Sequence, residues 1–157
     1  MYKRQSWSSG KLAWARVNKR LPSYAYYNAS GDAMSGYESD TGSTQRSFFR
    51  MGTSGVAKKR IVKATFRAIN TWSWSCTPAP VQAWATNGIG AGTTWNSQPS
   101  WLYLLQERSA SYNYIGSGQT TTSCPGVGGG IEFDATRLVT NAAANSLSLI
   151  HISEPTR

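Results

Sequence analysis

The side chains of this sequence best suited to binding chemistry are its tryptophans, of which the 157-residue chain holds seven. Trp72 and Trp74 are two positions apart, so their rings share one face of an extended segment. Trp84 alternates with small apolar residues and falls on the opposite face of its run. Flat rings stack against the apolar faces of sugars, and cations such as Lys63 and Arg67 can contact acidic groups of a polysaccharide. These five residues are the predicted ligand-binding set. The alternative is that the rings fill a core and the cations lie on a solvated strand face.

The acidic side chains form no pattern that predicts catalysis. Glycoside hydrolysis needs two paired carboxylates, and the Asp and Glu residues show no recognisable pairing. The single histidine, His151, lies in residues 147–157, which are interpreted below as adapter-derived, so no catalytic triad is expected either. Asp32, Glu38, Asp40 and Asp134 offer the oxygen ligands that calcium prefers, but their spacing is not that of an ion-binding loop. We predict turn and helix-capping roles for them, with no catalytic residue, metal site or cofactor.

Charge and hydropathy limit the classes of partner. The formal net charge is +9, and it includes the run Lys58-Lys59-Arg60. Such a charge suits an acidic polysaccharide better than a neutral one. Nucleic acid is not the predicted partner, because no nucleic-acid-binding motif accompanies the basic residues. A solvated loop and strand face is the favoured explanation of these basic residues. No stretch of about 18 apolar residues is present, so membrane insertion is not predicted.

The two cysteines, Cys76 and Cys124, are predicted to form a disulfide. Zinc is disfavoured because the chain has no Cys-x-x-Cys pair and lacks the histidines that such sites add. Two free thiols remain the alternative. A disulfide indicates an oxidising compartment, so the expected localisation is secreted or at the cell surface.

Two runs, Ile61–Asn70 and Val81–Thr86, show the period of two expected of strands with one buried face. The residues predicted to face the core are Val62, Ala64, Phe66 and Ala68 in the first run and Val81, Ala83 and Ala85 in the second. Further strands are expected at Gln45–Met51 and Ile131–Asp134, and the apolar run Trp101–Leu105 is expected to be buried. A short helix is expected at Arg137–Ala144, capped by Asp134 or Thr136. Many turns between short strands predict an all-β sandwich with antiparallel sheets.

Both ends of the chain are expected to be foreign to the fold. Residues 147–157 match the in-frame translation of a transposase sequencing adapter, and residues 1–5 match the reverse complement of the same adapter. Segments of this kind are left out of fold reasoning. The expected natural unit is residues 6–146, an incomplete module from a longer chain with other domains.

Several motifs together resemble a known family, the DNRLRE-type domains of secreted actinobacterial proteins, which are similar to carbohydrate-binding module family 96. The motifs are Arg46-Ser47-Phe48-Phe49-Arg50-Met51, Trp72-Ser73-Trp74-Ser75-Cys76, Thr93-Thr94-Trp95-Asn96-Ser97-Gln98-Pro99 and Gly130-Ile131-Glu132-Phe133-Asp134. The resemblance implies a jelly-roll-like β-sandwich whose strands continue after the short helix, and those C-terminal strands are missing here. Gly52 stands where the family motif usually has Asp, which removes any carboxylate role at that position.

The sequence and the resemblance together predict a non-catalytic extracellular module that binds a polysaccharide or cell-wall glycan for a larger secreted protein. One alternative is a structural spacer or adhesin stalk with no ligand of its own. The other is a piece of a polysaccharide-degrading enzyme.

Overall fold

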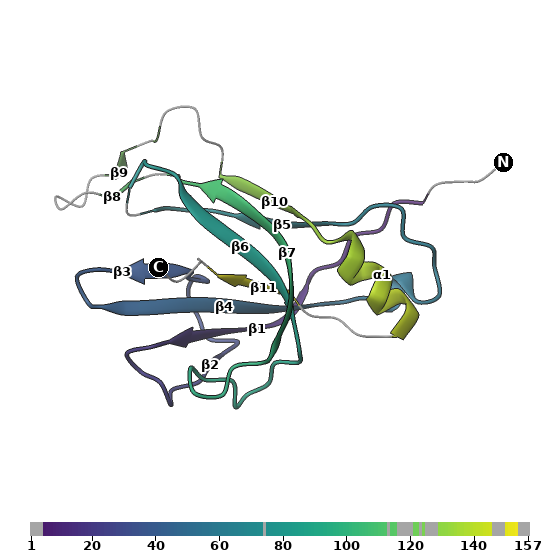
Figure 1. The fold of residues 1–157 in the computed structure, drawn as a ribbon, viewed down its shortest axis with the longest axis horizontal. Coiled ribbons are helices and arrows are strands. Elements are labelled where there is room, and N and C mark those ends of the chain that lie inside the picture. Colours follow the sequence, from purple (N-terminus) through teal and green to yellow (C-terminus); the bar gives the residue numbers. More distant parts are fainter. Residues whose placement is uncertain are drawn as a thin grey trace.

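The protein is an antiparallel β-sandwich with two layers of unequal size (Figure 1), as expected from the sequence. The computed structural model describes residues 5–73, 75–112, 114–115, 121–122, 124, 129–145 and 150–153. The larger layer is a seven-stranded sheet in the order β2-β1-β4-β11-β6-β7, with β3 paired to β4. Its strands are β1 Lys11–Asn18, β2 Tyr26–Tyr27, β3 Gly36–Glu38, β4 Ser43–Met51, β6 Ala79–Thr86, β7 Trp101–Ala110 and β11 Ile150–Ser153.

The smaller layer pairs β5 (Thr65–Ile69) with β10 (Gly130–Asp134). A separate two-stranded ladder joins β8 (Tyr114–Ile115) to β9 (Thr121–Thr122), and a 3₁₀ turn, η1, spans Ser54–Val56. All pairings between the described strands are antiparallel.

The core between the layers is built on aromatic contacts. Phe66 of β5 lies 5.8 Å from Phe49 of β4 and 6.4 Å from Phe133 of β10, measured between ring centroids. Ala83 of β6 is fully buried beside Phe66 and Phe133. Because side chains alternate across a strand, Trp84 must point away from this core.

The opposite face of the large sheet is also covered. Phe48 precedes Phe49 in β4 and points to the opposite face, where it is fully buried against Ala13, Ala15 and Val17 of β1. Ile89 and Trp95 pack on the same cluster, so the segment 87–100 folds over this face. We call this the outer face, meaning the face of the large sheet that points away from β5 and β10.

Helix α1 (Thr136–Asn145) follows β10 directly and matches the predicted helix to within one residue at each end. Asp134 is the cap, because its Oδ1 accepts a hydrogen bond of 2.8 Å from the Thr136 backbone N–H. Ala142 and Ala143 are buried, and the Ala143 carbonyl accepts a hydrogen bond from the Lys58 N–H at 2.9 Å. The helix is thereby held against the segment that follows η1.

Strand periodicity predicted most facing residues correctly. Phe66, Ala83 and Ala85 are buried, whereas Lys63 and Arg67 are exposed. The prediction for Val62 was wrong, since its side chain is 69% exposed. The reason is that β5 begins only at Thr65, so the alternation does not extend back to Val62.

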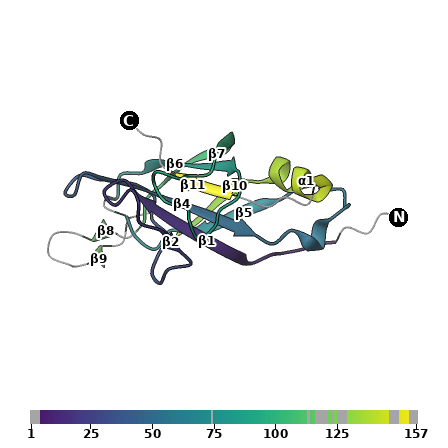
Figure 2. The same ribbon diagram turned by 90° about the horizontal axis from the view of Figure 1, so that it is seen from below.

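Strand β11 lies inside the large sheet, between β4 and β6 (Figures 1 and 2). Ile150 pairs with Phe49 on one side and with Ala85 on the other. Among the described strands, this four-residue segment is the hydrogen-bonded link between the β4 and β6 halves of the sheet. Backbone pairing of this kind requires no particular side chains, so the position of β11 does not test the adapter origin expected for residues 147–157. That origin stays a prediction.

The predicted disulfide is present, joining Cys76 to Cys124 with their Cα atoms 5.2 Å apart. Ser111 is buried beside it and donates from its hydroxyl to the Cys76 carbonyl at 3.1 Å. The disulfide connects the segment between β5 and β6 to the region before β10.

Within the described part of the chain, no helix has the length and hydropathy that a membrane span requires.

Candidate ligand-binding surface

Trp84 is half-buried on the outer face of β6, with its ring against that of Trp101. The two ring centroids are 5.3 Å apart and the ring planes are inclined by 49°. The sequence correctly placed Trp84 opposite the alanines of β6. It did not predict the contact with Trp101, which depends on how β6 and β7 pair.

Arg46 of β4 continues this aromatic cluster. Its guanidinium carbon lies 4.9 Å from the Trp101 ring centroid and 4.6 Å from that of Trp95, so the cation contacts both rings. Nη1 donates to the Gln98 side-chain oxygen at 3.1 Å, and Gln98 in turn donates to the Trp95 carbonyl at 2.9 Å. The Thr93–Pro99 motif thus folds around the arginine.

The guanidinium of Arg46 makes only some of the hydrogen bonds that it could donate. Its Nε is buried and makes no hydrogen bond, and among the described residues no carboxylate forms a salt bridge with it. Burial lowers the pKa of Arg46, but a guanidinium stays protonated at neutral pH. The outer face therefore holds a positive charge between two indole rings, without an acidic partner among the described residues.

Polar side chains extend the cluster in the other direction. The Trp84 indole N–H donates to the Gln82 side-chain oxygen at 2.9 Å. The Gln82 amide nitrogen donates to Oε2 of Glu107 at 2.7 Å, across the β6–β7 pair. We call the series Glu107, Gln82, Trp84, Trp101 and Arg46 the tryptophan row. It combines flat rings with amide, carboxylate and guanidinium groups on one face of the sheet.

The structure does not bring all predicted site residues together. Lys63 and Arg67 are exposed beside and within β5, in the smaller layer, and Arg67 faces Glu132 of β10 with Nε and Oε1 3.9 Å apart. Because the intervening Phe66 points into the core, these cations lie on the opposite side of the sandwich from Trp84. They cannot contact a ligand that rests on the tryptophan row.

Trp72 is half-buried and also lies away from Trp84. The hydroxyl of the neighbouring Ser73 accepts a hydrogen bond of 3.0 Å from the Tyr112 N–H, just beyond the end of β7. Trp84 pairs with Leu104, six residues before Ala110, and six strand residues span about 20 Å. Trp74 lies outside the described residues.

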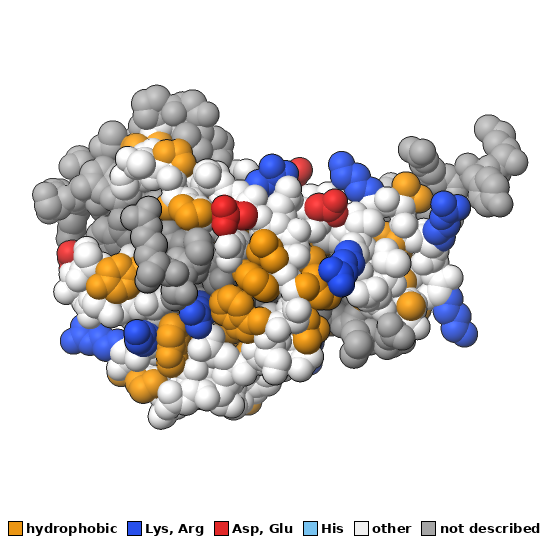
Figure 3. Space-filling view, viewed as in Figure 1, with side chains coloured by type: hydrophobic (Ala, Val, Ile, Leu, Met, Phe, Trp, Pro, Cys, Tyr) orange, Lys and Arg blue, Asp and Glu red, His pale blue; other side chains and the backbone are white. Residues whose placement is uncertain are grey.

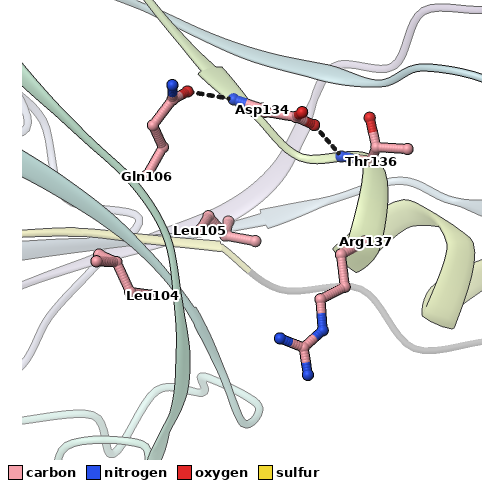
Figure 4. Close-up of a pocket in the computed structure, with 6 residues that line it drawn as sticks. All are labelled: Leu104, Leu105, Gln106, Asp134, Thr136 and Arg137. Carbon is pink, nitrogen blue, oxygen red and sulfur yellow. Dashed lines mark hydrogen bonds between the residues drawn. The ribbon is translucent and has the colours of Figure 1, made fainter.

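A second feature is a hollow between β7 and the start of α1, with a volume of about 520 Å³ (Figure 4). Its wall comprises Leu104, Leu105, Gln106, Asp134, Thr136 and Arg137. The Gln106 side-chain oxygen accepts a hydrogen bond from the Asp134 N–H at 2.8 Å. Figure 3 shows apolar side chains gathered over the middle of the face on which β6 and β7 lie in Figure 1, with acidic and basic groups beside them.

The described residues include no metal centre. No group of three or more His, Cys, Asp or Glu side chains is placed to hold a metal ion there. Glu38 accepts a hydrogen bond from the Thr41 hydroxyl, and Asp40 one from Ser39. These contacts agree with the predicted turn roles.

Sequence reasoning missed Arg46, Gln82 and Glu107 as members of the site. Arg46, Phe48 and Arg50 alternate in the sequence and therefore share one face of the strand. A prediction that Phe48 is buried would have indicated that Arg46 also lies on a packed face.

Comparison with known proteins gave no match, neither to a protein-family model nor to a curated protein.

Proposed function

We propose that this protein is a non-catalytic binding module for a polysaccharide, with the tryptophan row as its contact surface. The observation that carries the proposal is Trp84, a large apolar ring on the outer face of the sheet, adjacent to Trp101 and hydrogen-bonded to a chain of polar side chains. An indole ring offers an apolar face to sugar C–H groups, while Gln82, Glu107 and Arg46 offer donors and acceptors for hydroxyls.

The resemblance to DNRLRE-type domains supports the same function and an extracellular setting. The disulfide is in keeping with an oxidising compartment. The module then serves a larger secreted protein by holding it on a polysaccharide or cell-wall glycan. Arg46 and the positive net charge of +9 favour an acidic polysaccharide, so binding weakens as salt is added.

Affinity gels and calorimetry test the proposal with two probes, de-esterified polygalacturonate as an acidic glycan and xylan as a neutral one. Trp84→Ala should reduce binding by up to about ten-fold, since stacking on one ring contributes up to about 1.5 kcal/mol. The matched control is Trp7→Ala, which removes an indole that is 44% exposed and precedes β1. Its binding should equal that of the unaltered protein.

A spacer or adhesin stalk is the competing function. Failure of the folded protein to bind either probe or any glycan on an array would favour the spacer. Hydrolysis of a probe would instead point to an enzyme.

A further inference from the structure

The hollow between β7 and α1 adjoins the tryptophan row. Trp84 and Leu104 are directly opposite one another in the β6–β7 pair, so their side chains lie on one face of the sheet with Cβ atoms about 5 Å apart. Leu104 is also a wall residue of the hollow. Since β7 is the edge strand of the large sheet, no other strand separates the two features.

The rim between them is apolar and accessible. The expectation that Trp101–Leu105 is buried was wrong for two residues, because Leu104 is 42% exposed and Leu102 is 55% exposed in the edge strand β7. A polymer that stacks on Trp84 would therefore meet aliphatic surface as it passes over β7, rather than a polar barrier.

The far wall of the hollow carries polar side chains. The exposed Arg137 guanidinium lies 3.9 Å from the Tyr103 ring centroid, and the Tyr103 hydroxyl accepts a hydrogen bond from Asn141 at 3.2 Å. These contacts orient the guanidinium at the first turn of α1. Among the described residues Arg137 has no carboxylate partner.

Gln106 and Asp134 complete this polar set. The Gln106 oxygen is used by the Asp134 N–H, which leaves the amide nitrogen without an acceptor among the described residues. One carboxylate oxygen of Asp134 caps α1, and the residue as a whole is exposed. Planar amide, carboxylate and guanidinium groups are the groups that hydrogen-bond neighbouring hydroxyls on a sugar ring.

We propose that the hollow is a second sugar subsite, which takes the units of a polysaccharide that follow the unit stacked on Trp84. This inference rests on the proposed function, because it extends the same ligand over Leu104 to Arg137. It predicts that affinity rises with oligosaccharide length, and that the rise depends on the hollow while the affinity of short ligands does not.

Calorimetry with galacturonate oligomers from dimer to hexamer tests the proposal, with xylose oligomers of the same lengths as the neutral series. Arg137→Ala and Leu104→Ser should each lower hexamer affinity about ten-fold, as expected for loss of one charge-assisted hydrogen bond or one apolar contact. Dimer affinity should stay unchanged. Matched controls are Arg67→Ala and Ile69→Ser, which alter an exposed arginine and an aliphatic side chain that is 73% exposed on the smaller layer.

The outcomes separate the two proposals. If Trp84→Ala abolishes binding but both hollow variants keep full hexamer affinity, the hollow subsite is overturned and the proposed function stands. An equal loss in Arg67→Ala and Arg137→Ala would also overturn the subsite, since general charge would then explain it. If the folded protein binds no oligomer of either series, both proposals fail. Circular dichroism establishes that each variant is folded.

Discussion

The guanidinium of Arg46 lies over the indole ring of Trp95, 4.6 Å from its centroid, and this contact fastens the segment 87–100 to the outer face of the sheet. Burial lowers the pKa of Arg46 without neutralising it, so a positive charge is retained within a packed cluster. The two rings and Gln98 compensate for the water that the guanidinium loses. The same group that stabilises the fold thus gives the tryptophan row its charge.

Arg46→Ala is therefore expected to lower the free energy of unfolding by about 2–3 kcal/mol, from two cation–π contacts and one charge-assisted hydrogen bond. Urea unfolding followed by tryptophan fluorescence measures the change. The control is Arg50→Ala, an exposed arginine on the same strand, which should change stability by no more than about 0.5 kcal/mol. Equal effects of the two substitutions would show that the Trp95 contact adds nothing.

The disulfide between Cys76 and Cys124 closes a loop of 48 residues. A cross-link of that length restricts the unfolded chain by about 4 kcal/mol, so the double variant Cys76→Ser, Cys124→Ser should melt well below the parent protein. Mass spectrometry with alkylation checks the bond directly. Protein made in an oxidising host should gain alkyl groups only after reduction, and labelling of both thiols beforehand would contradict the pairing.

Asp134 should make the stability of the protein depend on pH in the acid range. Two hydrogen bonds from Thr136 lower the pKa of Asp134 below its ordinary 3.8. The bond from the Thr136 hydroxyl has the larger effect, and the bond from its backbone N–H has the smaller. A carboxyl group whose pKa is lower in the folded state contributes stability above its ordinary value, and loses it as the pH falls through the folded value.

Asp134→Asn should consequently reduce the melting temperature at pH 7, with a difference that shrinks below pH 3.8 and then disappears. Calorimetric melts across this range measure it, and Asp40→Asn serves as an exposed turn control. A difference that stays constant down to the most acidic pH would show that charge at Asp134 is not the cause.

The sequence pattern predicted the features that depend only on residues close together in the chain. The period of two placed Phe66 inward and Arg67 outward, and Asp134 was one of two residues predicted to cap the helix. These outcomes depend on neighbouring residues alone. The pattern could not show that Arg67 and Trp84 belong to opposite layers, since that depends on which strands pair. Nor could it show that Arg46 meets Trp95, which requires the segment 87–100 to fold across the sheet.

Strand β11, Ile150–Ser153, is expected to stabilise the large sheet mainly through its backbone. The segment joins β4 to β6 through backbone hydrogen bonds, with Ile152 opposite both Ser47 and Ala83. A proline at residue 152 has no N–H to donate to this ladder, so Ile152→Pro should lower the free energy of unfolding by about 1–3 kcal/mol, the cost of a buried unpaired group. Deleting residues 147–157 should cost more, because every pairing of β11 is lost.

Replacement of Ile150–Ser153 by Val-Thr-Val-Thr separates backbone from side chains. If the segment is of adapter origin, its side chains were never selected to fit this sheet, and any sequence with good strand propensity should serve equally well. The replaced protein should then match the parent to within about 0.5 kcal/mol in urea unfolding. A large loss on replacement would contradict the adapter expectation, whereas full tolerance of both the proline and the deletion would show that β11 does not belong to the folded sheet.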